Sequence, residues 1–194
     1  MEFTPRLQQI ATVLLEEDVS VWQKARQTWQ NDPEAFVEEG LADRYQVDEL
    51  LDKGPDDKES QISLFLGVAL DLGYSLYVDW SGEESEGDFE TWVDARLHAF
   101  GQAFDYMVIE DWLDQVDEDS LERGDYILQK FALVGKAVAE QGFTLIFFQE
   151  GGDTYFPFLL RSADWEKMPA AVRSASDDED PYPYLCSYAE LPSS

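Results

Sequence analysis

Two clusters of carboxylates are the groups in this sequence with the most obvious chemical potential. The first lies between Asp79 and Glu90, and the second lies between Glu110 and Asp125. Carboxylates held close together can bind a cation, divide acid–base work between them or attract a positively charged partner. The spacing of the residues decides among these three kinds of chemistry.

The first cluster can be compared with the calcium-binding loop of an EF-hand. Asp79, Ser81 and Glu83 fall at the first, third and fifth positions of such a loop. Glu90 falls at the last position, where a bidentate carboxylate is required. The sharp turn in the middle needs glycine, but this sequence has Glu84 there, and a strand rather than a helix precedes the loop. We therefore expect no metal site.

The second cluster raises the question of a charged surface. If 110–125 were one helix, four carboxylates would recur at four-residue spacing, and like charges at that spacing destabilise a helix. We expect a break near Val116 and a solvated acidic face; the functional alternative is a surface that imitates a phosphate backbone or docks a basic protein. The candidate partner-binding residues from both clusters are Glu83, Glu84, Glu86, Asp88, Glu110, Asp114, Glu118 and Glu122.

A small-molecule site or a hydrolase site is the alternative from another functional class. With 42 Asp and Glu in the chain, some pair suits acid–base catalysis by chance. His98 is the only histidine and no nucleophile motif accompanies it, so we assign no catalytic residue. Gly151-Gly152 precedes a strand, whereas phosphate-binding glycines precede a helix, so we expect no cofactor. The residues near the expected strand ends that could form a ligand site are Asp79, Trp80, His98, Asp153 and Tyr155.

The overall charge restricts the partners. The 194 residues include 13 Lys and Arg against 42 Asp and Glu, a formal net charge of −29. Residues 61–126 carry 2 basic and 17 acidic residues, so −15 of that charge falls in the middle third of the chain. Because nucleic acids and anionic membranes attract basic surfaces, we expect no direct nucleic-acid or membrane binding. A salt-adapted host would also explain the acidity without any partner.

Composition and cysteine content indicate a folded protein of the cytoplasm. Aromatic residues make up 14% of the chain, far more than in disordered acidic segments. The single cysteine, Cys186, excludes an internal disulfide and a zinc site built from several cysteines. No apolar stretch follows a basic start, and the longest apolar run, 62–70, is too short to cross a bilayer. The sequence leaves the oligomeric state open.

Two similar helix–glycine–strand units are expected to position the candidate residues. An apolar helix ends at Gly73 before a strand at 74–80. A second apolar helix ends at Gly142 before a strand at 143–148, with residues of matching type. The repetition fits either a degenerate duplication or independent use of the same helix-to-strand loop.

The remaining elements predict an α+β fold. Helical spacing dominates the first sixty residues, Glu150–Asp153 is typical of a hairpin turn, and Pro157 favours an edge position for the return strand. An apolar patch at 104–109 suggests a further short strand. We expect a helical N-terminal layer, then a small, mainly antiparallel sheet of about three or four strands packed by helices. The expected boundaries are one domain at 1–175, with 1–55 as the helical layer, and an acidic C-terminal tail at 176–194.

One family resemblance accompanies these features. The strand that ends at Asp79-Trp80 leads into an acidic loop, and Asp153-Thr154-Tyr155 follows the second helix–glycine–strand unit. Over residues 60–165 these segments resemble a bacterial family of small acidic proteins catalogued as a domain of unknown function. The resemblance implies an α+β fold and a cytoplasmic setting, and it brings no activity, ligand or site residue with it.

The sequence therefore favours a non-enzymatic, acidic interaction module whose partner is a basic protein. An immunity-type inhibitor or a nucleic-acid mimic fits that description, although the likeness to immunity proteins is one of composition only. The alternatives are the ligand-binding or hydrolase site described above and a housekeeping domain of a salt-adapted host.

Overall fold

The computed structural model describes residues 3–79, 87–113, 124–173 and 183–191. The chain divides into two compact units, 1–75 and 76–194. The single domain that the sequence suggests at 1–175 stays a prediction, and each unit is described by itself.

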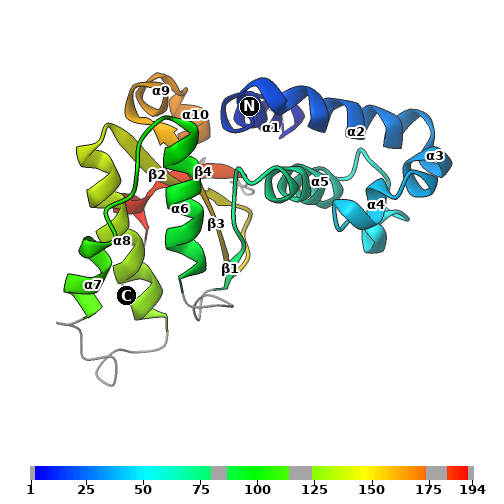
Figure 1. The fold of residues 1–194 in the computed structure, drawn as a ribbon. Coiled ribbons are helices and arrows are strands. Elements are labelled where there is room, and N and C mark those ends of the chain that lie inside the picture. Colours follow the sequence, from blue (N-terminus) through cyan, green and yellow to red (C-terminus); the bar gives the residue numbers. More distant parts are fainter. Residues whose placement is uncertain (1–2, 80–86, 114–123, 174–182, 192–194) are drawn as a thin grey trace. The chain divides into compact units, whose positions relative to one another are not determined.

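The secondary structure described in the N-terminal unit consists of helices joined by turns (Figure 1). Its helices are α1 (Phe3–Leu14), α2 (Val19–Asn31), α3 (Pro33–Glu38), α4 (Leu41–Arg44) and α5 (Lys58–Asp71), with short 3-10 helices at Glu16–Asp18 and Asp48–Leu50. The Asp32 carboxylate accepts a hydrogen bond from the Ala35 amide at 3.0 Å, so α3 begins with a side-chain cap and a proline in the first turn.

Aromatic side chains fill the core of this unit. Trp29 stacks on Phe36 with ring centroids 5.1 Å apart, and Trp22 meets Phe65 of α5 edge to face at 6.3 Å. Helix α5 is buried along most of its length, which agrees with its apolar sequence. Gly67 lets α5 approach Tyr45 so closely that an added Cβ would lie 2.2 Å from the Tyr45 carbonyl oxygen.

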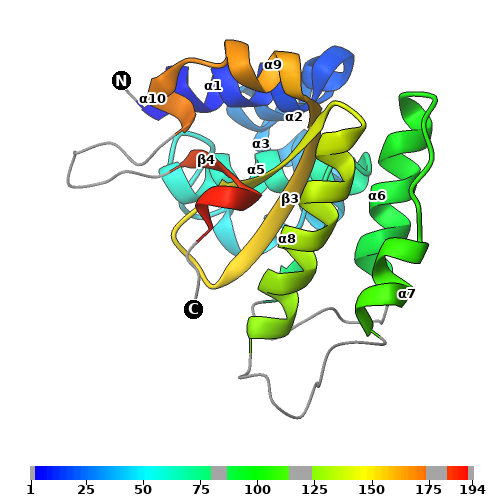
Figure 2. The same ribbon diagram turned by 90° about the vertical axis from the view of Figure 1, so that its left-hand side faces the viewer.

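The C-terminal unit combines helices with an antiparallel sheet, which confirms the expected α+β class (Figure 2). Its elements are β1 (Val78–Asp79), α6 (Asp88–Ala99), α7 (Met107–Leu113), α8 (Asp125–Glu140), β2 (Phe143–Gln149), β3 (Thr154–Arg161), α9 (Ser162–Lys167), α10 (Ala170–Arg173), β4 (Tyr184–Ser187) and the 3-10 helix η4 (Tyr188–Glu190). The strand order is β1-β3-β2-β4, and all three pairings are antiparallel. The β2–β3 hairpin is the one expected at Glu150–Asp153.

Two details of the strands differ from expectation. The first strand is only Val78–Asp79, because the amides of Tyr74 and Ser75 both bond to the Ala69 carbonyl and belong to the end of α5. β3 lies between β1 and β2, so Pro157 is not on an edge strand. Pro157 is tolerated because β1 pairs only with Thr154 and Tyr155 and ends before it.

Two further segments were misjudged from the sequence. The apolar patch at 104–109 runs into helix α7 instead of forming a strand, because the Asp105 carboxylate accepts from the Met107 amide at 3.1 Å and starts a helical turn. Residues 184–187, inside the expected tail, form β4 and pair with β2. The rest of that tail up to residue 182 lies outside the described residues.

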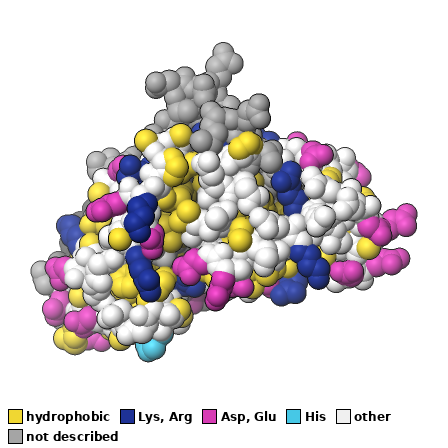
Figure 3. Space-filling view, turned by 90° about the horizontal axis from the view of Figure 1, so that it is seen from above, with side chains coloured by type: hydrophobic (Ala, Val, Ile, Leu, Met, Phe, Trp, Pro, Cys, Tyr) yellow, Lys and Arg dark blue, Asp and Glu magenta, His cyan; other side chains and the backbone are white. Residues whose placement is uncertain are grey.

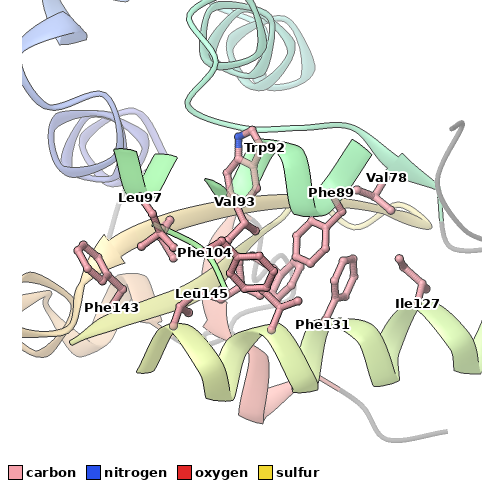
Figure 4. Close-up of a cluster of buried hydrophobic side chains, with 14 of the residues drawn as sticks. Val78, Phe89, Trp92, Val93, Leu97, Phe104, Ile127, Phe131, Phe143 and Leu145 are labelled. Atoms are coloured by element: carbon pink, nitrogen blue, oxygen red, sulfur yellow. The ribbon is translucent and has the colours of Figure 1, made fainter. Parts of the chain in front are cut away.

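The core of this unit is an apolar cluster between α6, α8 and the sheet (Figure 4). The ring of Phe131 on α8 lies 4.9 Å from Phe89 of α6 and 4.7 Å from Phe147 of β2, measured between centroids. Figure 4 shows Val78 and Phe89 at one end of the cluster and Leu97 and Phe143 at the other. Helix α6 therefore runs along the cluster from the β1 end to the end where β2 begins.

Candidate functional site

One row of ionisable side chains runs along α6. Glu90, Asp94 and His98 are four residues apart, so they lie on one face of the helix. Glu90 is buried, Asp94 is intermediate and the His98 side chain is 65% exposed. The row thus leads from the interior of the C-terminal unit to its surface.

The buried end of the row is an ion pair between two helices. Nζ of Lys130 on α8 lies 2.8 Å from Oε1 of Glu90, and only 2% and 6% of the two side chains are exposed. The Lys130 ammonium also lies 5.4 Å from the centroid of the Tyr126 ring. Oε2 of Glu90 has no hydrogen-bond partner among the described residues. This pair holds α6 against α8 and is inaccessible to a partner.

Asp94 joins the row to the loop before α7. Its Oδ1 accepts a hydrogen bond from the Phe104 amide at 2.9 Å and lies 3.3 Å from Nδ1 of His98. Partial burial, with the carboxylates of Asp94 and Glu90 nearby, raises the pKa of Tyr106 above its usual value. The Tyr106 hydroxyl therefore stays protonated and remains a donor to the Asp94 carboxylate.

The loop and the first turns of α7 form an exposed surface of mixed character. Tyr106 and Met107 are 43% and 55% exposed, and they are adjacent in the sequence. Asp105, Glu110 and Asp111 beside them are exposed as well. We call these five residues the α7 surface. Tyrosine and methionine are enriched at protein interfaces, and the carboxylates give the surface a negative charge.

The residues expected to bind a basic partner are placed only in part. Asp88 is the exposed first residue of α6, and Glu110 is exposed on α7. The N-terminal cap of α6 is Gly87, whose backbone is left-handed, so Asp88 belongs to the first turn of the helix. The expected break near Val116 and the other partner-binding residues lie outside the described residues; these are Glu83, Glu84, Glu86, Asp114, Glu118 and Glu122.

Part of the alternative ligand site is brought together. Asp79 pairs with Thr154 across β1 and β3, and Asp153 is the residue before Thr154, so the backbones of Asp79 and Asp153 lie near each other at the hairpin. Tyr155 is half-buried, with its ring 5.2 Å from Phe131, and burial together with Asp153 raises its pKa. Trp80 lies outside the described residues.

His98 is placed at the other end of the unit. It lies between Leu97 and Phe100, whose ring is 5.0 Å from that of Phe143, and Phe143 pairs with Arg161. Arg161 and Thr154 are the two ends of β3, about 23 Å apart at 3.3 Å per residue. The structure therefore does not bring His98 to Asp79 and Asp153.

The residue that sequence reasoning missed is Lys130. It is the one charged residue inside the apolar stretch from Tyr126 to Val134, and an isolated charge on a buried helix face signals a buried partner. Glu90 matches the last position of a calcium-binding loop, but its position one residue after Phe89 places it at the start of an amphipathic helix. In the part of the chain that the structure describes, no three His, Cys, Asp or Glu side chains are grouped to hold a metal ion.

The exposed charge is not continuous. On the face drawn in Figure 3, Lys and Arg side chains stand among the carboxylates, and apolar side chains separate them. Within the described ranges, no helix combines the length and the apolar character needed to cross a bilayer.

Comparison with known proteins places the chain in a family. A family model described as a domain of unknown function, DUF6630, matches residues 6–177, so the chain belongs to that family. The match extends beyond the segment at 60–165 on which the resemblance rests. No curated protein and no solved structure matches the chain.

Proposed function

We propose that this member of the DUF6630 family is a non-enzymatic interaction module that binds a basic protein through the α7 surface. The observation that carries the proposal is the exposure of Tyr106 and Met107 beside three exposed carboxylates. Adjacent apolar side chains supply the contact area of an interface, and the carboxylates select a positively charged partner and speed its approach.

The charge of the whole chain supports the same partner chemistry. A net charge of −29 attracts basic proteins over distances comparable to the Debye length and repels nucleic acids. An inhibitor of the immunity type, or a protein that competes with nucleic acid for a basic cleft, would use this combination. The proposal places the protein in the cytoplasm, since its one cysteine needs no oxidising compartment.

The proposal is tested by capture from a lysate of the source organism with matched variants. Tyr106→Ala/Met107→Ala removes the apolar contact, and Asp105→Asn/Glu110→Gln/Asp111→Asn removes three charges while keeping oxygen acceptors. The control Glu34→Gln/Glu38→Gln/Glu39→Gln removes three exposed charges from α3 and its end. We expect a basic protein that wild type and control retain at low salt and that both α7-surface variants lose.

The affinity of the purified partner for each variant tests the proposal directly. It should fall by about tenfold or more in either α7-surface variant, and the charge variant alone should lose most of its salt dependence. Equal retention by the α7-surface variants and the control would contradict the proposal. That result would favour acidity that reflects a salt-adapted host, without a specific partner.

A further inference from the structure

A polar cavity lies on one face of the N-terminal unit. Its volume is about 270 Å³. Its walls come from α2, which contributes residues one helical turn apart, and from one residue of α1. The lining residues are Gln8, Trp22, Gln23, Arg26, Gln27 and Gln30.

The described part of the lining is unusual for so acidic a chain, because it contains four glutamines and one arginine but no carboxylate. Asp56 stands at the edge, where it accepts from Nε2 of Gln30 at 2.7 Å. The Arg26 guanidinium is only loosely paired with Asp56. Nη2 of Arg26 is 3.7 Å from Oδ1 of Asp56, and the Asp56 side chain is 82% exposed. Arg26 therefore keeps most of its capacity to donate hydrogen bonds.

Two buried donors of this lining have no acceptor. Nε1 of Trp22 and Nε of Arg26 are both buried and without a hydrogen-bond partner among the described residues. Trp22 is 1% exposed, so water does not compensate its indole N–H at the protein surface. Leaving buried donors unpaired costs free energy, and a ligand that supplies acceptor oxygens would recover it.

We propose that this cavity binds the carboxylate group of a small molecule. A carboxylate is planar and offers two acceptor oxygens, which match the edge of a guanidinium that carries Nε. The glutamine amides can donate to further oxygens of the same ligand and accept from its donors. Gln23 and Gln27 are exposed, so their side chains can turn aside to admit the ligand.

Size and charge narrow the ligand class. A volume of about 270 Å³ lies just below the usual range for drug-sized ligands, so the ligand is a small metabolite. Inorganic phosphate can carry two negative charges on one tetrahedral group, whereas each carboxylate of a small acid carries one, and Arg26 is the one cation of the described lining that could balance them. We therefore expect carboxylates to bind in preference to inorganic phosphate.

The test is a titration of the full chain with glutarate, followed by the indole N–H signals in ¹H–¹⁵N correlation spectra. Trp22→Phe assigns the signal of Trp22. We expect that signal to shift in a saturable way, while inorganic phosphate at the same ionic strength leaves it in place. Arg26→Gln should weaken glutarate binding by about tenfold or more. The matched control Lys24→Gln, an exposed charge on the same helix, should change it by less than about twofold.

Three results would overturn the proposal: no saturable shift at any glutarate concentration, equal weakening by Arg26→Gln and Lys24→Gln, or equal binding of phosphate. The spectra of each variant report whether it is folded. If Arg26→Gln fails to fold, Arg26→Lys keeps the charge but removes Nε, and Gln27→Ala changes the lining without touching the core. Either variant must then weaken glutarate binding for the proposal to stand.

Discussion

Nζ of Lys130 lies 2.8 Å from Oε1 of Glu90, and this buried contact joins α8 to α6 across the core of the C-terminal unit. Two charges removed from water are costly, and each is tolerated here because the other is present. Glu90 also lies one helical turn before Asp94, which anchors the loop that leads to the α7 surface. The geometry of the proposed partner surface thus depends on a pair that no partner touches.

Removing one partner of this pair should be strongly destabilising. Lys130→Met leaves the Glu90 carboxylate buried without a counter-charge, so we expect the free energy of unfolding to fall by about 3–5 kcal/mol. Urea denaturation measures it. The double variant Glu90→Leu/Lys130→Met replaces the pair with apolar groups and should recover most of the loss. Lys136→Met, which changes an exposed lysine of α8, is the control and should cost little. If Lys130→Met and Lys136→Met lower the free energy of unfolding by the same amount, the buried pair does not contribute the expected stability.

Close packing between α8 and η4 gives a second prediction. A Cβ added at Gly135 would lie 2.4 Å from the ring of Tyr188, too close for any real contact. Gly135→Ala should therefore lower stability by about 1–3 kcal/mol, although alanine favours a helix by about 1 kcal/mol over glycine. Tyr188→Ala removes the ring, so Gly135→Ala should be harmless or stabilising in that background. Destabilisation by Gly135→Ala in both backgrounds would contradict the assigned contact.

The domain organisation can be tested with glycine variants from both units. Gly67→Ala would force a Cβ against the Tyr45 backbone, which cannot move aside as a side chain can. If residues 1–175 fold as the single domain that we propose, Gly67→Ala and Gly135→Ala should each lower the midpoint of one and the same thermal transition. Calorimetry of the full chain would show this. Two separate transitions, with each variant lowering only one, would show that the units unfold independently.

Local sequence signals were sufficient to predict several structural elements. Gly73 and Gly142 each follow a helix with a left-handed backbone, which glycine adopts without strain, so both helix ends could be predicted. The hairpin at Glu150–Asp153 follows from the same property of Gly151, whose φ is 102°. These predictions succeeded because the signal and the structure that it determines lie within a few residues.

Predictions that depend on distant residues were less successful. β4 could not be recognised from four residues behind Pro181 and Pro183, because its strand character comes from pairing with β2. The length of β1 is limited by the hydrogen bonds that end α5 and by where β3 begins. Lys130 and Glu90 are 40 positions apart in the sequence, and no local pattern connects them. Tertiary contacts of this kind, and not local sequence propensity, determine these strands and this ion pair.

The cap of α5 should make stability depend on pH in the acidic range. The Asp57 carboxylate accepts a hydrogen bond from the Ser60 amide at 3.1 Å, and that bond is the main cause of its lowered pKa. A lowered folded-state pKa means that the stabilisation is present above the unfolded pKa of about 4 and is lost as the pH falls through the folded value. Asp57→Asn keeps an acceptor that does not titrate, so its stability should fall less steeply below about pH 4.

Acid titration of stability, followed by circular dichroism, measures this difference. Asp52→Asn is the control, because it removes one exposed charge from the same connection between α4 and α5. The control should keep the acid dependence of the wild type. Identical curves for Asp57→Asn and Asp52→Asn would show that the cap does not contribute to acid sensitivity.

The Cys186 thiol should be unreactive in the folded protein, and its ionisation at alkaline pH should destabilise the fold. Burial raises the pKa of its thiol to about 12, against about 8.5 in an unfolded chain. Because the thiolate is the reactive form, we expect a thiol reagent at pH 8 to label the folded chain about a thousandfold or more slowly than the chain in denaturant.

The raised pKa of Cys186 also stabilises the fold below about pH 8.5, and that contribution is lost as the pH rises toward 12. Cys186→Ala should therefore lose less stability between pH 8.5 and 10 than wild type does. Tyr155, whose pKa is also raised, should add its own loss of stability only as the pH rises past about 10. Rapid labelling of the folded protein would mean that β4 leaves the sheet readily, because Cys186 lies opposite Phe147 on β2 and is reached only when that pairing opens.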